Sequence, residues 1–79
     1  MDIERVISTY ENDSFIEEYD VSNIPFEELK KLFVLKQNDP QMYDPYEISV
    51  DIGLNMSSLI PDIKFHFEKY EYFLECFQR

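Results

Sequence analysis

Two stretches of alternating residues, joined by a turn sequence, open the chain and constrain its fold more than any other feature. Residues 2–10 place Val6, Ser8 and Tyr10 on one face, and residues 15–21 place Phe15 on the same face as Glu17. Between them, residues 11–14 read Glu-Asn-Asp-Ser, types that tolerate left-handed backbone or bond their own main chain. The sequence therefore predicts an N-terminal β-hairpin.

A short helix is expected next, over residues 25–35. Ser22 or Asn23 can cap it, and Pro25 suits the first helical turn. Acidic residues follow at the end where the helix dipole favours negative charge. The apolar residues at helical spacing are Phe26, Leu29, Leu32 and Phe33. Two Asp-Pro pairs then predict a loop over residues 36–45.

The second half of the chain allows two interpretations in each of two places. Residues 46–56 alternate like a strand, yet residues 52–60 keep helical spacing and Ser49 can cap a helix. We expect a short strand at 46–48 and a helix at 50–59, ended by Pro61. Residues 63–77 alternate as an aromatic strand, with a helix from Glu68 onward as the alternative.

Together these elements predict a single α+β domain spanning residues 1–79. Its core is a mainly antiparallel sheet, built from the N-terminal hairpin and the C-terminal strand, with one or two short helices packed on one face. The chain has seven Phe, six Tyr and one Gly, so aromatic rings supply much of a small core and nothing indicates disorder.

The charge of the chain is strongly acidic. Seven Lys and Arg stand against 17 Asp and Glu, a net charge of −10 at pH 7. Such a surface is repelled by nucleic acid and by anionic lipid, and it attracts basic proteins. No Lys or Arg occurs between Val6 and Leu29, which leaves acids there without local counter-charges. The alternative interpretation is that acidity only keeps the protein soluble.

No targeting, membrane-spanning or disulfide feature is recognisable. Cys76 is the single cysteine, so an internal disulfide is excluded. The first residues lack a basic segment followed by an apolar run, and no apolar stretch approaches the roughly 20 residues that span a bilayer. We therefore expect a cytoplasmic protein with no membrane contact.

Catalytic chemistry is not expected. His66 and Cys76 are the lone residues of their types, and a cysteine hydrolase would need them paired with an acid. No calcium-loop or zinc-site spacing is present, and one glycine cannot build a phosphate-binding loop. The sequence predicts neither an enzyme nor a bound cofactor or metal.

A loop with two prolines is the richest candidate for binding a partner. Residues 39–46 read Asp-Pro-Gln-Met-Tyr-Asp-Pro-Tyr, in which carboxylates and tyrosines together suit a Lys- and Arg-rich protein surface. The alternative is that its tyrosines close the core. Acids of the C-terminal strand can also line an exposed sheet face beside Glu17 or Glu18. The candidate partner-binding residues are Glu17, Asp39, Tyr43, Asp44, Tyr46 and Glu71.

Three sequence motifs resemble those of an uncharacterised family of small acidic bacterial proteins. They are Leu32-Phe33, the Asp39–Asp44 segment and the Tyr-Glu-Tyr-Phe-Leu-Glu sequence of residues 70–75. In size and acidity the chain is also similar to immunity proteins of contact-dependent inhibition and colicin-type toxins. That resemblance implies a stoichiometric complex with a basic toxin domain of the nuclease type. Two alternatives are an acidic nucleic-acid mimic or antitoxin that regulates a DNA-binding protein, and a small structural or assembly subunit.

Overall fold

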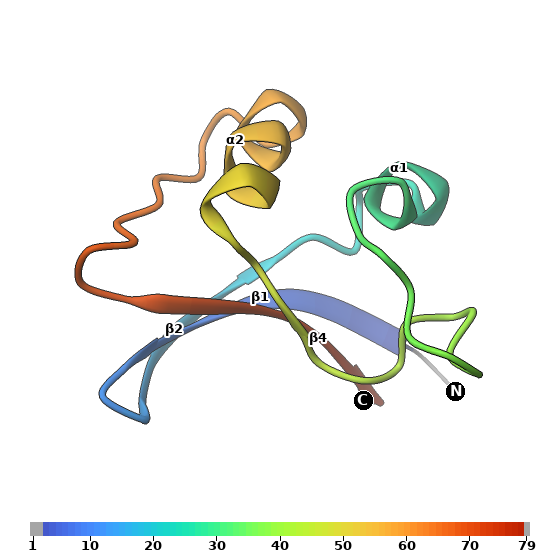
Figure 1. The fold of residues 1–79 in the computed structure, drawn as a ribbon, viewed down its shortest axis with the longest axis horizontal. Helices are drawn as coiled ribbons and strands as arrows, with labels where there is room; N and C mark the ends of the chain where they lie inside the picture. Colours follow the sequence, from blue (N-terminus) through green and yellow to red (C-terminus); the bar gives the residue numbers. More distant parts are fainter. Residues whose placement is uncertain (1–2, 79) are drawn as a thin grey trace.

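The computed structural model describes residues 3–78 and confirms the α+β class. Four antiparallel strands form one sheet in the order β2-β1-β4-β3. Both helices lie on the same side of this sheet (Figure 1). The elements are β1 (Ile3–Glu11), β2 (Ser14–Asp20), α1 (Phe26–Lys30), β3 (Tyr46–Glu47), α2 (Val50–Leu59) and β4 (Glu71–Gln78).

The N-terminal hairpin is confirmed, with one correction to its second strand. Asn12 and Asp13 form a two-residue turn with φ of 50° and 68°, the left-handed pair that matches the twist of a hairpin. A bulge follows, because the register of β1 and β2 shifts between Thr9 and Tyr10. Phe15 therefore pairs with Tyr10, and its ring meets the Tyr10 ring edge-on at 5.9 Å. The expectation that Phe15 shares a face with Glu17 is wrong.

Helix α1 is shorter than the predicted 25–35, and it begins differently. Pro25 occupies the N-cap position, and no side chain caps the helix. The hydroxyl of Ser22 instead accepts a hydrogen bond from the backbone N–H of Arg5 at 3.0 Å, so it ties the end of the hairpin together. The backbone N–H of Leu32 bonds to the carbonyl of Leu29, a tightened turn that ends the helix early.

The ambiguous middle segment folds as expected. Residues 46–47 form β3, and α2 covers residues 50–59. The hydroxyl of Ser49 caps α2 by accepting a hydrogen bond from the N–H of Ile52 at 3.3 Å. Pro61 follows two residues after the helix ends.

The C-terminal strand is shorter than the predicted 63–77. Strand β4 begins only at Glu71, and residues 63–70 form an irregular segment closed by a bond from the N–H of Tyr70 to the carbonyl of His66. The rings of Phe65 and Phe67 alternate because both pack against Tyr72, at 4.8 and 5.2 Å, rather than because they pair in a sheet. The alternative helix from Glu68 is also wrong, since β4 pairs with β1 along its whole length.

The core lies between the sheet and the two helices. Its buried residues come from every helix and strand except β2, and the segments between these elements add to it. They are Ile7, Val21, Leu29, Phe33, Met42, Tyr46, Ile48, Met56, Ile60, Tyr72 and Leu74. Across residues 3–78, neither helix has the length and apolar character needed to cross a membrane.

Candidate partner-binding surface

The pairing register divides the sheet into a covered face and an open face. Ile7 of β1 pairs with Leu74 of β4, and both are buried beneath the helices. Because side chains alternate along a strand, the neighbours of these residues point to the opposite side. Figure 1 shows no helix on that side, which we call the open face.

The open face gathers carboxylates from all four strands. Val6 lies between Asp20 of β2 and Glu75 of β4, and Phe73 of β4 lies opposite Glu47 of β3. By the same register, the acidic residues of this face are Glu4, Glu18, Asp20, Glu47, Glu71 and Glu75. Within residues 3–78 the strands bring no Lys or Arg to this face, so the charged side chains that the strands place there are all acidic.

Aromatic rings run between these acids. Tyr10 contacts Phe15 on one side and Phe73 on the other, both edge-on, with ring centroids 5.9 and 5.7 Å apart. Phe15 is 55% exposed. The hydroxyl of Tyr10 donates to Oε1 of Glu75 at 2.9 Å, and this hydrogen bond to a carboxylate raises the pKa of Tyr10. The open face therefore offers apolar rings framed by carboxylates.

Asp39 organises the two-proline loop from inside. Its carboxylate accepts hydrogen bonds from the N–H of Tyr43 at 2.8 Å, from the N–H of Asp44 at 3.3 Å and from the hydroxyl of Tyr46 at 2.8 Å. Burial alone raises the pKa of this carboxyl, but the three hydrogen bonds together with the positive charge of Lys36 outweigh burial and hold the pKa of Asp39 below its ordinary value. Asn38 and Met42 adopt left-handed backbone, which folds the loop back on itself.

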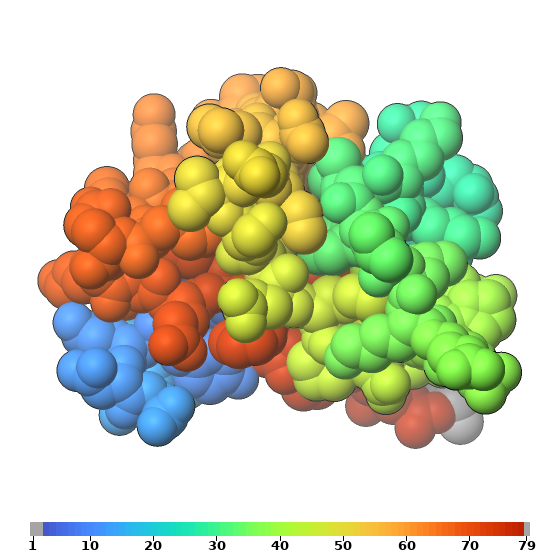
Figure 2. All heavy atoms as spheres, viewed as in Figure 1, coloured from blue at the N-terminus to red at the C-terminus, as the bar shows by residue number. Residues whose placement is uncertain are grey.

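Tyr46 fastens the same loop to the sheet. Its hydroxyl also accepts a hydrogen bond from the N–H of Lys36 at 2.9 Å, and the Lys36 ammonium lies 4.8 Å from its ring centre. The side chain is buried, and burial raises the pKa of Tyr46. Figure 2 shows the segment, green to yellow-green, lying against the rest of the molecule between α1 and the sheet.

The structure thus separates the candidate residues predicted from sequence. Asp39 and Tyr46 are buried and hold the loop, whereas Tyr43 and Asp44 are exposed on it. The interpretation that a loop tyrosine closes the core is confirmed for Tyr46, whereas partner binding by the exposed Tyr43 stays a prediction. Glu71 lies on the open face, opposite Tyr10.

Glu17 and Glu18 point to opposite sides of the sheet. Glu17 pairs with Thr9, on the covered face but at the exposed outer strand, whereas Glu18 pairs with Ser8 on the open face. The acids of β4 therefore share a face with Glu18 and not with Glu17.

Several residues of the open face were not among the candidates from sequence. They are Glu4, Asp20, Glu47 and Glu75, with the rings of Tyr10, Phe15 and Phe73, and Glu18 was named only as an alternative neighbour to Glu17. The alternation of β4 places Glu71 and Glu75 together, but their neighbours on other strands depend on the pairing register, which sequence alone does not give.

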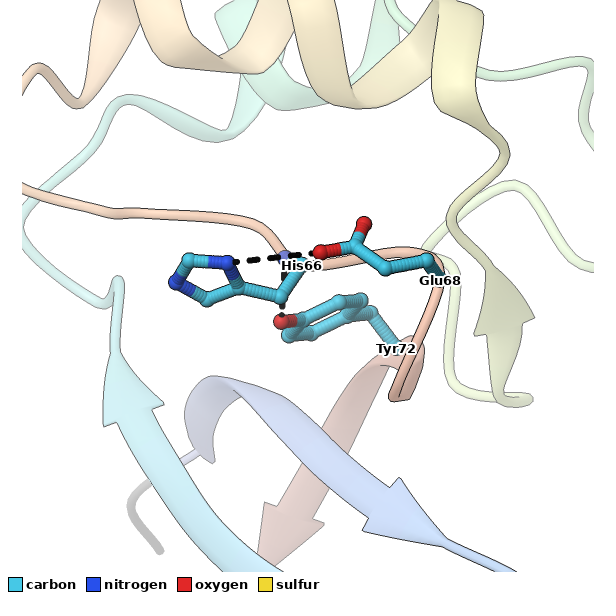
Figure 3. Close-up of polar contacts among 3 residues, drawn as sticks. All are labelled: His66, Glu68 and Tyr72. Atoms are coloured by element: carbon cyan, nitrogen blue, oxygen red, sulfur yellow. Dashed lines mark hydrogen bonds and ion pairs between the residues drawn. The ribbon is translucent and has the colours of Figure 1, made fainter.

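His66 and Cys76 are not brought together. The N–H of His66 donates to the hydroxyl of Tyr72 at 2.8 Å, while its imidazole points outward, 3.8 Å from the carboxylate of Glu68 (Figure 3). Cys76 lies four residues beyond Tyr72 along β4, a separation of about 13 Å. Among residues 3–78, no group of three or more His, Cys, Asp or Glu is placed to hold a metal ion.

Comparison with known proteins places the chain in a family. Neither a search of curated proteins nor a search of solved structures finds a match. A family model described as a domain of unknown function, DUF7683, matches residues 4–75. The match runs from β1 into β4 and so includes most of the open face and the whole two-proline loop. Because it spans nearly the entire sequence, the chain belongs to the DUF7683 family.

Proposed function

We propose that this protein is an immunity or inhibitor protein that neutralises a basic cytotoxic domain of the nuclease class. It acts by stoichiometric binding, and the open face of the sheet is the surface that meets the partner. No cofactor or metal takes part in this function, and its site of action is the cytoplasm.

The open face is the observation that carries the proposal. Carboxylates from four strands frame the rings of Tyr10, Phe15 and Phe73, and the described strands add no basic side chain to them. A field of one sign accelerates encounter with a partner of the opposite sign. The exposed ring of Phe15 and the partly exposed rings of Tyr10 and Phe73 supply the apolar contact that holds such a complex together once it forms.

The mixture of rings and acids favours a protein partner. A nuclease cleft presents Lys and Arg that bind phosphate, and carboxylates pair with the same groups. Arg also stacks on aromatic rings, at about 0.5–1 kcal/mol for an exposed contact. A surface of carboxylates alone would resemble a phosphate backbone more closely, whereas here Tyr10 and Phe73 interrupt the acidic rows.

The first test is capture of the partner. The tagged protein is purified from its native cells at low and at moderate salt, and retained proteins are identified. We expect a single basic protein in stoichiometric amount, less of it at the higher salt, whose toxicity or nuclease activity disappears in the complex. Retention of a DNA-binding regulator would support the antitoxin alternative, and retention of copies of the chain alone would support the structural subunit.

Charge reversal then locates the interface. The E47K/E71K variant alters two exposed acids of the open face, and the D51K/E27K variant makes the same change of net charge on exposed residues of the two helices. We expect the first to lose the partner and its inhibition, and the second to keep both. Equal loss in the two variants would show that only net charge matters and would remove the open face from the proposal.

A further inference from the structure

We propose that an extended basic segment of the partner adds to the sheet as a new strand along β2. This inference rests on the proposed function, because it takes the partner to be a basic protein. The part of the partner that binds is then an extended strand, and its binding site is the β2 edge of the sheet.

Strand β2 is an outer strand of the sheet and is accessible along its whole length. The order β2-β1-β4-β3 leaves it paired on one side only, and all seven of its residues are exposed. Figure 1 shows β2 at the margin of the sheet, with neither helix lying along its outer side. An accessible outer strand is a template on which an extended peptide can pair.

The hydrogen bonds of the hairpin show which way the main chain of β2 is turned. The N–H of Val21 donates to the carbonyl of Arg5 at 2.9 Å, so at this position the backbone faces β1. In an antiparallel pair, alternate residues face the neighbouring strand and the residues between them face away. Between the bulge and Val21, β2 therefore directs the N–H and C=O groups of Glu18 and Asp20 outward, at the spacing that a further strand requires.

The side chains of β2 define the charge of the incoming segment. Glu17 projects on the covered face, and Glu18 and Asp20 project on the open face. A strand that combines pairs of adjacent Lys or Arg with Thr or Val would present positive side chains on both faces, beside Glu17 on one and beside Glu18 and Asp20 on the other. It would lay its small side chains near the exposed Ile16 and Tyr19.

The same acids argue against a second copy of this chain as the occupant. Antiparallel pairing of two β2 strands around Glu18 would set the two Glu18 side chains opposite each other. Like charges placed directly opposite each other across a strand pair are destabilising. The edge therefore disfavours its own copies and favours a basic strand.

The test uses a defined peptide on the intact protein. The probe is a seven-residue peptide that combines pairs of adjacent lysines with threonine and valine, blocked at both ends, and it is titrated into the isotope-labelled protein. We expect the NMR signals of the β2 amides to shift, and alternate β2 amides to exchange more slowly with solvent. The same peptide methylated on alternate backbone nitrogens cannot donate those bonds, and we expect it to bind at least about tenfold more weakly.

Two variants separate this inference from the proposed function. Glu17→Lys changes β2 on the covered face, away from the open face, whereas Glu47→Lys changes the open face at β3, two strands away from β2. We expect Glu17→Lys to weaken binding of the peptide by about fivefold and Glu47→Lys to leave it unchanged.

The outcomes distinguish the two proposals. Equal binding of the methylated peptide, no shift at β2, or shifts confined to residues 71–75 would overturn strand addition. Any of these results leaves the open face to be judged by partner capture. Conversely, slowed exchange at β2 that Glu17→Lys abolishes would support strand addition even if E47K/E71K still retains and inhibits the partner.

Discussion

The hydroxyl of Tyr46 donates a hydrogen bond to Oδ2 of Asp39 at 2.8 Å and accepts one from the N–H of Lys36. One phenol thus joins the first residue of β3 to two points of the loop before it. The loop is held in place by this arrangement, and Tyr43 and Asp44 are left at its exposed surface.

Removal of the Tyr46 hydroxyl is expected to destabilise the fold. In Tyr46→Phe, the N–H of Lys36 loses its acceptor and Asp39 loses one of its donors. Unsatisfied polar groups at a buried position are costly, and we expect Tm to fall by about 5–10 °C in a domain of this size. Thermal unfolding followed by circular dichroism measures the change.

Tyr43→Phe is the matched control for this substitution. Tyr43 is 54% exposed, and its backbone rather than its ring is bonded to Asp39. We expect its Tm to stay within about 2 °C of the parent protein. Equal losses in the two variants would contradict the role assigned to the Tyr46 hydroxyl.

The stability contributed by Asp39 should depend on pH in a definite direction. Hydrogen bonds hold the pKa of Asp39 below its ordinary value. The ionised carboxylate is therefore more stable in the folded protein than in the unfolded chain. The contribution is fully present above the ordinary Asp pKa of about 3.9 and is lost as the pH falls through the lowered value. Asp39→Asn, which has no such charge, should lack this component.

Urea unfolding at neutral pH and at several values below pH 4 checks this expectation. We expect the parent protein to be more stable than Asp39→Asn at neutral pH, and the difference to narrow progressively as the pH falls below about 4. A difference that stays constant over this range would mean that the carboxylate charge contributes nothing to the loop.

The hairpin turn leaves room for a stabilising substitution. Asp13 has φ of 68°, a conformation that costs a non-glycine residue energy and that glycine adopts freely. Asp13→Gly creates the Asn-Gly pair preferred in such turns, and we expect the free energy of unfolding to rise by about 0.5 kcal/mol. Asn23→Gly, an exposed position with no left-handed backbone, is the control and should not gain stability.

Local patterns predicted the hairpin, a short strand at residues 46–48 (β3 covers 46–47) and helix α2, because each depends on neighbours in the chain. The Ser49 cap and the turn at Asn12 and Asp13 are examples. The irregular segment 63–70 could not be recognised in the same way. Its alternating aromatic residues resemble a strand, yet Phe65 and Phe67 alternate because they pack on Tyr72.

The candidate surface was predicted only in part, for a related reason. Glu71 was expected from the alternation of its own strand, whereas Glu47 joins it only because β3 pairs with β4 next to Phe73. From the sequence, Asp39 was expected at the surface. In the structure its carboxylate is buried and accepts hydrogen bonds from three groups, which belong to residues up to seven positions away. Pairing between distant strands and the path of a loop are decided by the whole core.

Gly53 provides the last test, because helix propensity and packing oppose each other there. Alanine in the middle of a helix is favoured over glycine by about 1 kcal/mol. However, a Cβ at residue 53 of α2 would lie 2.6 Å from Cζ of Phe67. That ring is stacked on Phe65 at 5.2 Å and meets Tyr72 edge-on, so moving it away would disturb both contacts.

We therefore expect Gly53→Ala to destabilise the protein despite its better helix propensity. Overpacking of a filled site costs about 1–3 kcal/mol, which exceeds the gain. In a Phe67→Ala background the obstacle is absent, and the same substitution should become stabilising by about 1 kcal/mol. Urea unfolding of the four proteins measures both steps. The change in the free energy of unfolding caused by Gly53→Ala would then have opposite signs in the two backgrounds. A general effect of residue 53 on the helix cannot produce this reversal, whereas contact with the Phe67 ring does.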